Sequence, residues 1–318
     1  MNFSVTYPLI AHPCHPDFLE KANVIRFARA AEAAGFDALG FTDHPAPSHK
    51  WLQAGGHDAL DPFAALAFCA AVTDRIRLFP NIVVLPYRNP FLLAKAIATV
   101  DALSGGRFIL GTAAGYLRSE YAALGVDFAE RNELFDEAIE VLRGIWSTDE
   151  FSYQGRHFSA QGQTANPKPV QKPHPPIWIG GNSRLARRRV AKSAQGWMPF
   201  RASAALSRTT KTPVLETREH LARYLDELWA LRDEAGRDRA GIDIHFHDDQ
   251  GGAPGSSDFA PDACQEGLHA LAELGVTYCG TAVPGDSVDR AVEALEQFGA
   301  TVIAPFPEGR PRRRGGAH

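Results

Sequence analysis

Short apolar segments alternate with longer segments of helical periodicity along this chain, and the alternation is repeated eight times. This alternation is typical of parallel strands joined by helical crossovers, and eight strand–helix pairs predict an α/β fold closed into a (β/α)8 barrel, the TIM barrel. The predicted strands are residues 3–7, 37–41, 76–84, 107–112, 177–180, 196–200, 242–246 and 276–280. The predicted helices are residues 19–34, 62–73, 90–103, 131–146, 183–194, 216–235, 261–274 and 287–298.

A single domain is expected to contain nearly all of the chain. Barrels of this kind often exceed about 200 residues as one domain, and 318 residues with 45% hydrophobic content can bury a large core. We assign residues 1–304 to the barrel and residues 305–318, which include the sequence RPRRR, to a disordered basic tail. Segments rich in glycine and proline at 45–60, 151–176 and 251–259 are predicted loop insertions at the C-terminal face. The second of these is expected to contain a small hairpin around Gly155.

The composition argues against a nucleic-acid partner and against a membrane protein. Lysine and arginine number 33 against 37 acidic residues, for a net charge of -4, and the body of the chain has no long basic run. No apolar run reaches the roughly 18 residues of a membrane span, and residues 1–5 lack the features of an export signal. The four cysteines form no Cys-x-x-Cys pair. We therefore expect a cytoplasmic protein that acts on a small molecule.

Two polar residues, Asp43 and His44, directly follow the second predicted strand. In barrels of this type the loops at the carboxyl ends of the strands form the active site. A histidine oriented there by a neighbouring carboxylate can donate or accept a proton near neutral pH. An ordinary loop aspartate beside a histidine packed under the following insertion explains the same pattern equally well.

The fifth predicted strand ends in Gly180, Gly181 and Asn182 before a helix that begins near Ser183. Glycines let the backbone approach an anion closely, and the free N–H groups and dipole of a helix N-terminus attract a phosphate. A tight strand–helix turn that needs glycine only for backbone reasons is the alternative. The fourth strand ends in small residues, from Gly111 and Thr112 to Gly115 and Tyr116, which leave space for a flat ring or its polyol chain.

Two histidine groups suggest a metal site, but neither forms a converging ligand set. His12 and His15 flank Cys14 in a loop with prolines, and His245 and His247 end the seventh predicted strand. Histidines at such spacing can bind zinc. Metal-dependent hydrolase barrels draw ligands from several strands, a pattern that this sequence lacks. We therefore predict no metal and keep a metal-dependent hydrolase as a remote alternative.

Four sequence blocks together resemble the bacterial luciferase-like monooxygenase superfamily, in particular its F420-dependent oxidoreductase branch. The blocks are AEAAGFD at 31–37 running to Asp43-His44, VLPYRNP at 84–90 running to LSGGR at 103–107, LGV at 124–126 with FAER at 128–131, and PKPVQ at 167–171 with PPIWIGG at 175–181. Their order and spacing make the set specific. The resemblance covers roughly residues 1–200 and then thins.

The resemblance implies a barrel that binds coenzyme F420 or FMN. It places the redox ring against a bulge with a non-proline cis peptide at Asn81, Ile82 and Val83. By the same resemblance, the phosphate lies on Gly180, Gly181 and Asn182, and the polyol side is lined by Gly111, Thr112, Gly115 and Tyr116. Asp43 and His44 match the pair beside the ring, with His44 as the group that handles the proton.

The sequence differs from the sugar-phosphate dehydrogenases of this superfamily at two positions. Tyr116 stands about where they carry a glutamate, and Trp51 lies later than the tryptophan that follows their histidine. These departures argue against sugar-phosphate oxidation. The histidines at 12, 15, 245 and 247 are outside the general family pattern.

Our hypothesis from the sequence is an oxidoreductase that transfers a hydride between F420 and a small organic substrate. The main alternative is an FMN-dependent monooxygenase that receives reduced flavin from a reductase and activates O2. A cofactor-binding barrel without turnover is a further alternative. The resemblance also implies a homodimer, since members of the family are often dimers.

Overall fold

The strands of the barrel are short apolar segments, and most of their residues are buried because helices cover the sheet from outside. The computed structural model describes residues 1–306. Its parallel strands are β1 (Asn2–Thr6), β2 (Ala38–Phe41), β3 (Arg77–Pro80), β4 (Val83–Val84), β5 (Leu110–Ala113), β8 (Ile177–Gly180), β9 (Gly196–Met198), β10 (Asp243–His247) and β11 (Tyr278–Thr281). They form one sheet in the order β3-β2-β1-β11-β10-β9-β8-β5-β4.

This sheet is the predicted (β/α)8 barrel. A parallel bridge between Leu78 and Phe108 joins β3 to the residues before β5, so that the two ends of the sheet nearly close on each other. The strands β3 and β4 occupy the third strand position together, because the backbone bulges between them at the cis peptide Asn81–Ile82. Each of the eight predicted strands overlaps one strand position, and the expected cis peptide is confirmed.

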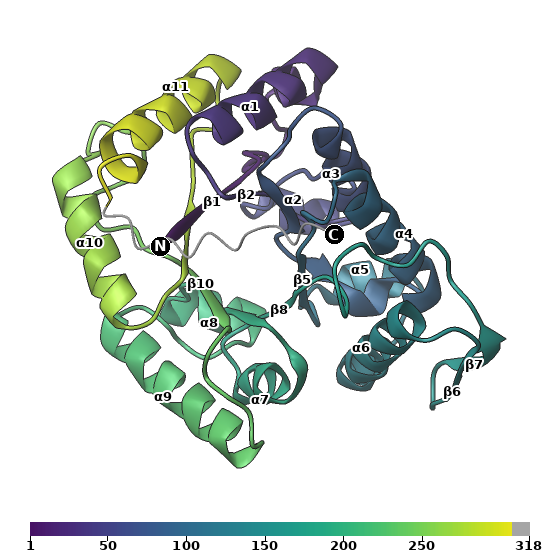
Figure 1. Cartoon of the computed structure of the whole chain (residues 1–318). Helices are drawn as coiled ribbons and strands as arrows, with labels where there is room; N and C mark the ends of the chain where they lie inside the picture. The colour runs from purple at the N-terminus through teal and green to yellow at the C-terminus, as the bar shows by residue number, and fades with distance from the viewer. Residues whose placement is uncertain (307–318) are drawn as a thin grey trace.

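The helices surround the strands (Figure 1). The large helices are α1 (Lys21–Ala33), α3 (Pro62–Ala70), α4 (Pro90–Leu103), α6 (Arg131–Ser147), α7 (Arg184–Ser193), α9 (Arg218–Glu234), α10 (Pro261–Glu273) and α11 (Val288–Phe298). The starts of α3 and α4 follow from the sequence. Asp61 and Asn89 accept hydrogen bonds from backbone N–H groups of the first turn, and a proline follows each of them.

Three short helices within the loops were not expected from the sequence. They are α2 (His49–Gln53), α5 (Arg118–Ala123) and α8 (Ala204–Thr210). Their lengths of five to seven residues give too little periodicity to separate them from loop. Two of them, α2 and α5, carry residues of the candidate site.

The predicted hairpin is present beside α6 (Figure 1), but it lies between α6 and β8, so this insertion is at the N-terminal ends of the strands and not at the predicted C-terminal face. It consists of β6 (Phe151–Gln154) and β7 (Ser159–Gln163), an antiparallel pair. The carboxylate of Glu137 in α6 accepts hydrogen bonds from backbone N–H groups of the turn, including those of Arg156 and His157, each at an N···O distance of 3.0 Å. These bonds attach the hairpin to the barrel. The predicted basic tail begins at residue 305, and residues 307–318 of it lie outside the described residues.

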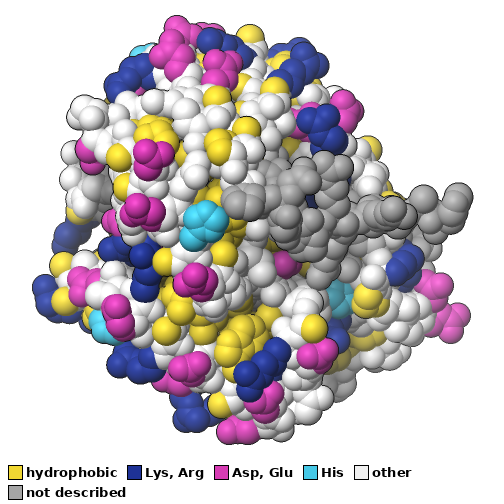
Figure 2. All heavy atoms as spheres, turned by 60° about the vertical axis from the view of Figure 1, so that its left-hand side comes forward, with side chains coloured by type: hydrophobic (Ala, Val, Ile, Leu, Met, Phe, Trp, Pro, Cys, Tyr) yellow, Lys and Arg dark blue, Asp and Glu magenta, His cyan; other side chains and the backbone are white. Residues whose placement is uncertain are grey.

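Charges of both signs are interspersed over the face shown in Figure 2. No large patch of a single sign is visible there. Among the helices of residues 1–306, none is long and apolar enough to cross a membrane.

A separate cluster of large side chains fills the interior of the barrel. Phe79, Trp178, Met198 and Tyr278 belong to it, and the ring of His245 lies 5.8 Å from that of Trp178. The Nε2 atom of His245 shares a hydrogen bond of 2.7 Å with the hydroxyl of Ser4. His245 is therefore a core residue of the barrel and does not face the loops at its C-terminal end.

Burial, with a smaller contribution from His247, lowers the pKa of His245 from 6.5 to about 4. Between these two pH values the unfolded chain binds a proton that the folded chain does not, so stability falls as the pH falls through this window. We expect the wild type to lose about 3 kcal/mol more unfolding free energy between pH 7 and pH 4 than His245→Gln loses. Urea unfolding of both proteins across this range tests the expectation. Equal losses in the two proteins would contradict it.

Candidate active site

The candidate site lies at the C-terminal ends of the neighbouring strand positions β2, β3/β4, β5 and β8. A Cβ atom added to Gly180 would lie 3.6 Å from the Ile82 side chain and 3.5 Å from that of Ala113. These are ordinary van der Waals distances. The bulge, the end of β5 and the end of β8 therefore form one continuous surface, which we call the strand-end floor.

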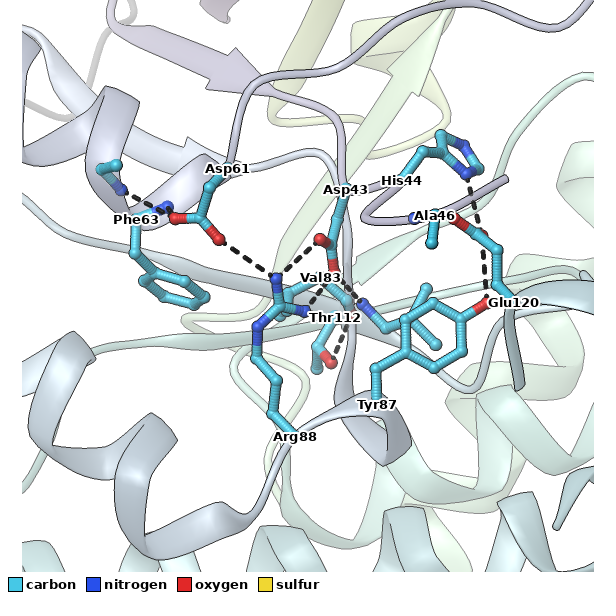
Figure 3. Close-up of polar contacts among 12 residues, drawn as sticks. Asp43, His44, Ala46, Asp61, Phe63, Val83, Tyr87, Arg88, Thr112 and Glu120 are labelled. Carbon is cyan, nitrogen blue, oxygen red and sulfur yellow. Dashed lines mark hydrogen bonds and ion pairs between the residues drawn. The ribbon is translucent and has the colours of Figure 1, made fainter. Parts of the chain in front are cut away.

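Asp43 is buried and fully engaged by other parts of the protein. Its two carboxylate oxygens accept hydrogen bonds of 2.6 and 2.8 Å from the guanidinium group of Arg88 (Figure 3). The backbone N–H of Val84 donates to the same carboxylate at 3.0 Å. Because Arg88 lies beyond β4 and Val84 is in it, Asp43 holds the bulge of the third strand in place. This arrangement gives Asp43 a positioning role.

His44 is held by a carboxylate that the sequence analysis did not identify. Its Nδ1 atom lies 3.1 Å from Oε2 of Glu120, and Glu120 is completely buried. The His44 ring keeps 13% of its side-chain surface exposed. An imidazole that is fixed through one nitrogen, in a side chain that stays partly exposed, is suited to transfer a proton.

The loop after β2 folds back and places two more rings against His44. Trp51 of α2 lies with its ring centroid 4.5 Å from that of His44, and the His57 ring lies at 5.0 Å. Tyr116 contributes a fourth ring, and its hydroxyl interacts with Trp51. The late position of Trp51 in the sequence therefore does not keep it from the site, because α2 brings it back to His44.

The predicted floor residues separate into exposed and buried groups. Ile82, Gly115 and Tyr116 are partly exposed, whereas Val83 and Thr112 are completely buried. The Thr112 hydroxyl donates to the carbonyl oxygen of Val83 at 3.0 Å. The Thr112 side chain thus links β5 to the backbone of β4, and neither buried side chain faces a ligand.

Two further predicted residues, Gly111 and Asn81, support the floor through contacts beneath its surface. A Cβ atom on Gly111 would lie 2.2 Å from the carbonyl oxygen of Pro80, so only glycine lets the third and fourth strand positions approach each other here. The side chain of Asn81 donates to the hydroxyl of Thr6 at 2.9 Å. Gly111 thus allows the close approach of the two strands, and the amide of Asn81 ties the bulge to β1.

The turn from β8 to α7 has the features of an anion site. Gly181 has a φ of +107°, a conformation that favours glycine. Within the described residues, no protein acceptor binds the backbone N–H groups of Ser183, Arg184 and Leu185, which lie at the start of α7. These orphan donors and the helix dipole can hold a phosphate.

Asn182 has a structural role in the same turn. Its side-chain amide donates to the carbonyl oxygens of Phe200 and Pro213 and accepts from the N–H of Phe200. The side chain is completely buried, so it fixes the loop after β9 and is not presented to a ligand.

Within the described residues, His12, His15 and His247 do not assemble a metal centre. His12 pairs with Asp58 at 2.7 Å, and His247 contacts the carbonyl oxygen of Gly280 at the same distance. His15 is exposed on the loop after β1. In residues 1–306, no group of three or more His, Cys, Asp or Glu side chains is arranged to hold a metal ion.

A groove of about 330 Å³ lies between the loops after β9 and β10. Its polar lining includes Arg201, Thr217, Arg218, Asp248 and Gln250. Arg218 pairs with Asp248 at 2.5 Å, so the charges of the groove largely satisfy one another.

Comparison with known proteins places the chain in a family. The family model described as luciferase-like monooxygenase matches residues 9–248. The protein therefore belongs to the luciferase-like monooxygenase family, whose members include oxidoreductases and monooxygenases.

Two curated relatives differ in their cofactor. The FMNH(2)-dependent dimethylsulfone monooxygenase of Pseudomonas putida is 38% identical over 120 residues, which are 37% of this chain and 33% of that enzyme. The F420-dependent glucose-6-phosphate dehydrogenase of Microbacterium testaceum is 28% identical over 237 residues, 71% of this chain and 65% of that enzyme. Among solved structures, monooxygenase RslO1 from Streptomyces bottropensis has a TM-score of 0.80 and 19% identity, covering 96% of this chain and 100% of that one. That likeness supports the fold.

Proposed function

We propose that this protein is an oxidoreductase that transfers a hydride between coenzyme F420 and a small organic substrate. The observation that carries the proposal is the arrangement of His44, held by a buried carboxylate, beside a strand-end floor that leads to the free N–H groups of α7. When bound, the deazaflavin supplies hydride exchange at its central ring. The protein supplies the surface for the ring, an anchor for the phosphate, and proton transfer at His44.

The residues present fit a flavin-type cofactor. The floor is apolar where Ile82, Ala113 and Gly180 meet, and no side chain rises from Gly180. A phosphate at the start of α7 would be bound by backbone N–H groups that have no protein acceptor. The loop that carries Trp51 and His57 covers His44 and limits its contact with water.

FMN-dependent monooxygenation is the second candidate. It is favoured by the 38% identity to the dimethylsulfone enzyme, although that match covers only 37% of this chain. The relationship to the F420-dependent dehydrogenase extends over 71% of the chain, which favours F420. The FMN alternative requires a flavin reductase as a partner and O2 as a second substrate.

Separate titrations of the cofactor-free protein with F420 and with FMN, followed by quenching of tryptophan fluorescence, test the proposal. We expect saturable quenching by F420 and weaker binding of FMN. Tight binding of FMN alone would favour the monooxygenase. Stoichiometric zinc together with no binding of either cofactor would overturn the oxidoreductase proposal and favour a hydrolase.

The floor itself can be tested with Gly180→Val. The Cβ atom of the new side chain meets its neighbours at ordinary contact distances, so the fold is expected to survive. Its two methyl groups would rise from the floor and weaken cofactor binding by about 10- to 100-fold. The same titration measures the loss, and thermal unfolding checks the fold. Unchanged affinity in a folded variant would show that the cofactor does not lie on this floor.

A further inference from the structure

Glu120 is a completely buried carboxylate at which three hydrogen bonds converge. Its Oε1 atom accepts from the backbone N–H of Ala46 at 3.2 Å. Its Oε2 atom lies 3.2 Å from the Tyr87 hydroxyl and 3.1 Å from Nδ1 of His44 (Figure 3). The three partners come from the loop after β2 and the segment after β4, whereas Glu120 comes from α5.

The charge of this carboxylate is not neutralised by a lysine or arginine. Within the described residues, no such side chain forms an ion pair with Glu120, because the nearby Arg88 is used by Asp43 and Asp61. A buried carboxylate without a cation is costly unless hydrogen bonds compensate for its lost hydration. The three donors supply this compensation, and one of them is the imidazole that the proposed function uses.

An ionised carboxylate only accepts hydrogen bonds, so both groups at Oε2 must donate to it. Burial and, next, the negative charge of Glu120 raise the pKa of Tyr87 above its usual range, so its hydroxyl keeps the proton. His44 must then carry its proton on Nδ1. This leaves the lone pair on Nε2, the ring atom that Glu120 does not engage.

We propose that Glu120 is a positioning residue that fixes the tautomer of His44. Hydrogen bonds from Tyr87 and from the backbone N–H of Ala46 hold the carboxylate in position. The tautomer makes Nε2 the atom through which His44 accepts a proton. The catalytic consequence rests on the proposed function. The tautomer itself is a property of the protein alone.

Glu120→Gln should reverse the tautomer. The N–H of Ala46 can only donate, so the oxygen of the new amide must remain at the Oε1 position. The amide NH2 group then occupies the Oε2 position and donates toward Nδ1 of His44. The proton of His44 therefore moves to Nε2, which can no longer accept one. Tyr87→Phe is the matched variant, because it removes the other contact at Oε2 and leaves the carboxylate to accept from Nδ1.

Two-bond proton–nitrogen NMR correlation of the cofactor-free protein reports the tautomer directly, and the His44 signals are assigned by their loss in His44→Gln. We expect the Nδ1–H form in the wild type and in Tyr87→Phe, and the Nε2–H form in Glu120→Gln. The Nε2–H form in the wild type, or an unchanged tautomer in Glu120→Gln, would overturn the proposal. Glu137→Gln, at a carboxylate that binds the hairpin turn, controls for the loss of a charge and should leave His44 unchanged.

Turnover supplies the second measurement. Glu120→Gln should lower kcat by about 10²- to 10⁴-fold with little change in KM, since the wrong tautomer removes the base about as completely as replacement of His44 does. A loss confined to KM would contradict the positioning role. Because the NMR measurement needs no cofactor, a protein that shows the expected tautomers but binds neither F420 nor FMN would refute the proposed function and leave the role of Glu120 intact.

Discussion

Replacing His44 with glutamine is expected to lower turnover by about 10²- to 10⁴-fold, the range that a positioned acid or base contributes. Glutamine is close to histidine in length, and its amide can still donate to the Glu120 carboxylate, so the packing against Trp51 should be largely kept. It has no group that exchanges a proton near neutral pH. The affinity for the cofactor should therefore change little while the chemical step slows.

Steady-state kinetics with the cofactor selected by the titrations, combined with cofactor affinity and thermal unfolding of the variant, measure this effect. His269→Gln is a suitable control, because His269 is exposed on α10 and stacks on Phe306, away from the strand-end floor. We expect the control to keep wild-type turnover. If His44→Gln kept it as well, His44 would have no part in proton transfer.

Asp43→Asn is expected to destabilise the fold by about 3–5 kcal/mol, the usual cost of breaking a buried ion pair from one side. The variant leaves the guanidinium group of Arg88, which is only 20% exposed, with Asp61 at 3.4 Å as its remaining acidic partner. It also weakens the contact with the N–H of Val84, which holds the bulge of the third strand. We expect the substitution to lower the free energy of unfolding, and to lower activity only because less of the protein is folded.

Denaturant unfolding of Asp43→Asn measures the free energy of unfolding directly. Asp286→Asn is the comparison, because its partner Arg290 and Asp286 itself are both exposed, and surface pairs of this kind contribute less than about 1 kcal/mol. A double-mutant cycle with Arg88→Met isolates the pair. A fully stable Asp43→Asn that had lost its turnover would instead indicate a direct role in the chemistry.

The sequence was sufficient to predict the barrel because its signals are local. Apolar segments such as those at Ile177 and Tyr278 predict strands, and the capping residues Asp61 and Asn89 mark the starts of helices. The interruption of the third strand at Ile82 came from the family resemblance alone. No apolar pattern in the sequence marks a bulge.

The site was predicted less completely, because its contacts join residues far apart in the chain. Glu120 lies 76 residues after His44, in a short helix with no periodic signal. Nothing in its own segment distinguishes it from an exposed glutamate. Asn182 shows the opposite problem, since its place after two glycines suggested a phosphate ligand but its side chain is used by the loop after β9.

Trp51 shows why spacing is an incomplete guide to position. Its late position after His44 in the sequence counted as a departure from the sugar-phosphate dehydrogenases. The structure folds α2 back over His44, with Gly56 packed so closely under the indole that a Cβ atom there would lie 2.4 Å from it. The argument against sugar-phosphate oxidation therefore depends on Tyr116 more than on Trp51.

The most direct test of the account is a crystal structure of the protein with whichever cofactor it binds. The account predicts that the redox ring lies on the floor formed by Ile82 and Gly180, beside His44, with the phosphate at the start of α7. A cofactor bound instead in the groove between Arg201 and Asp248 would contradict the account.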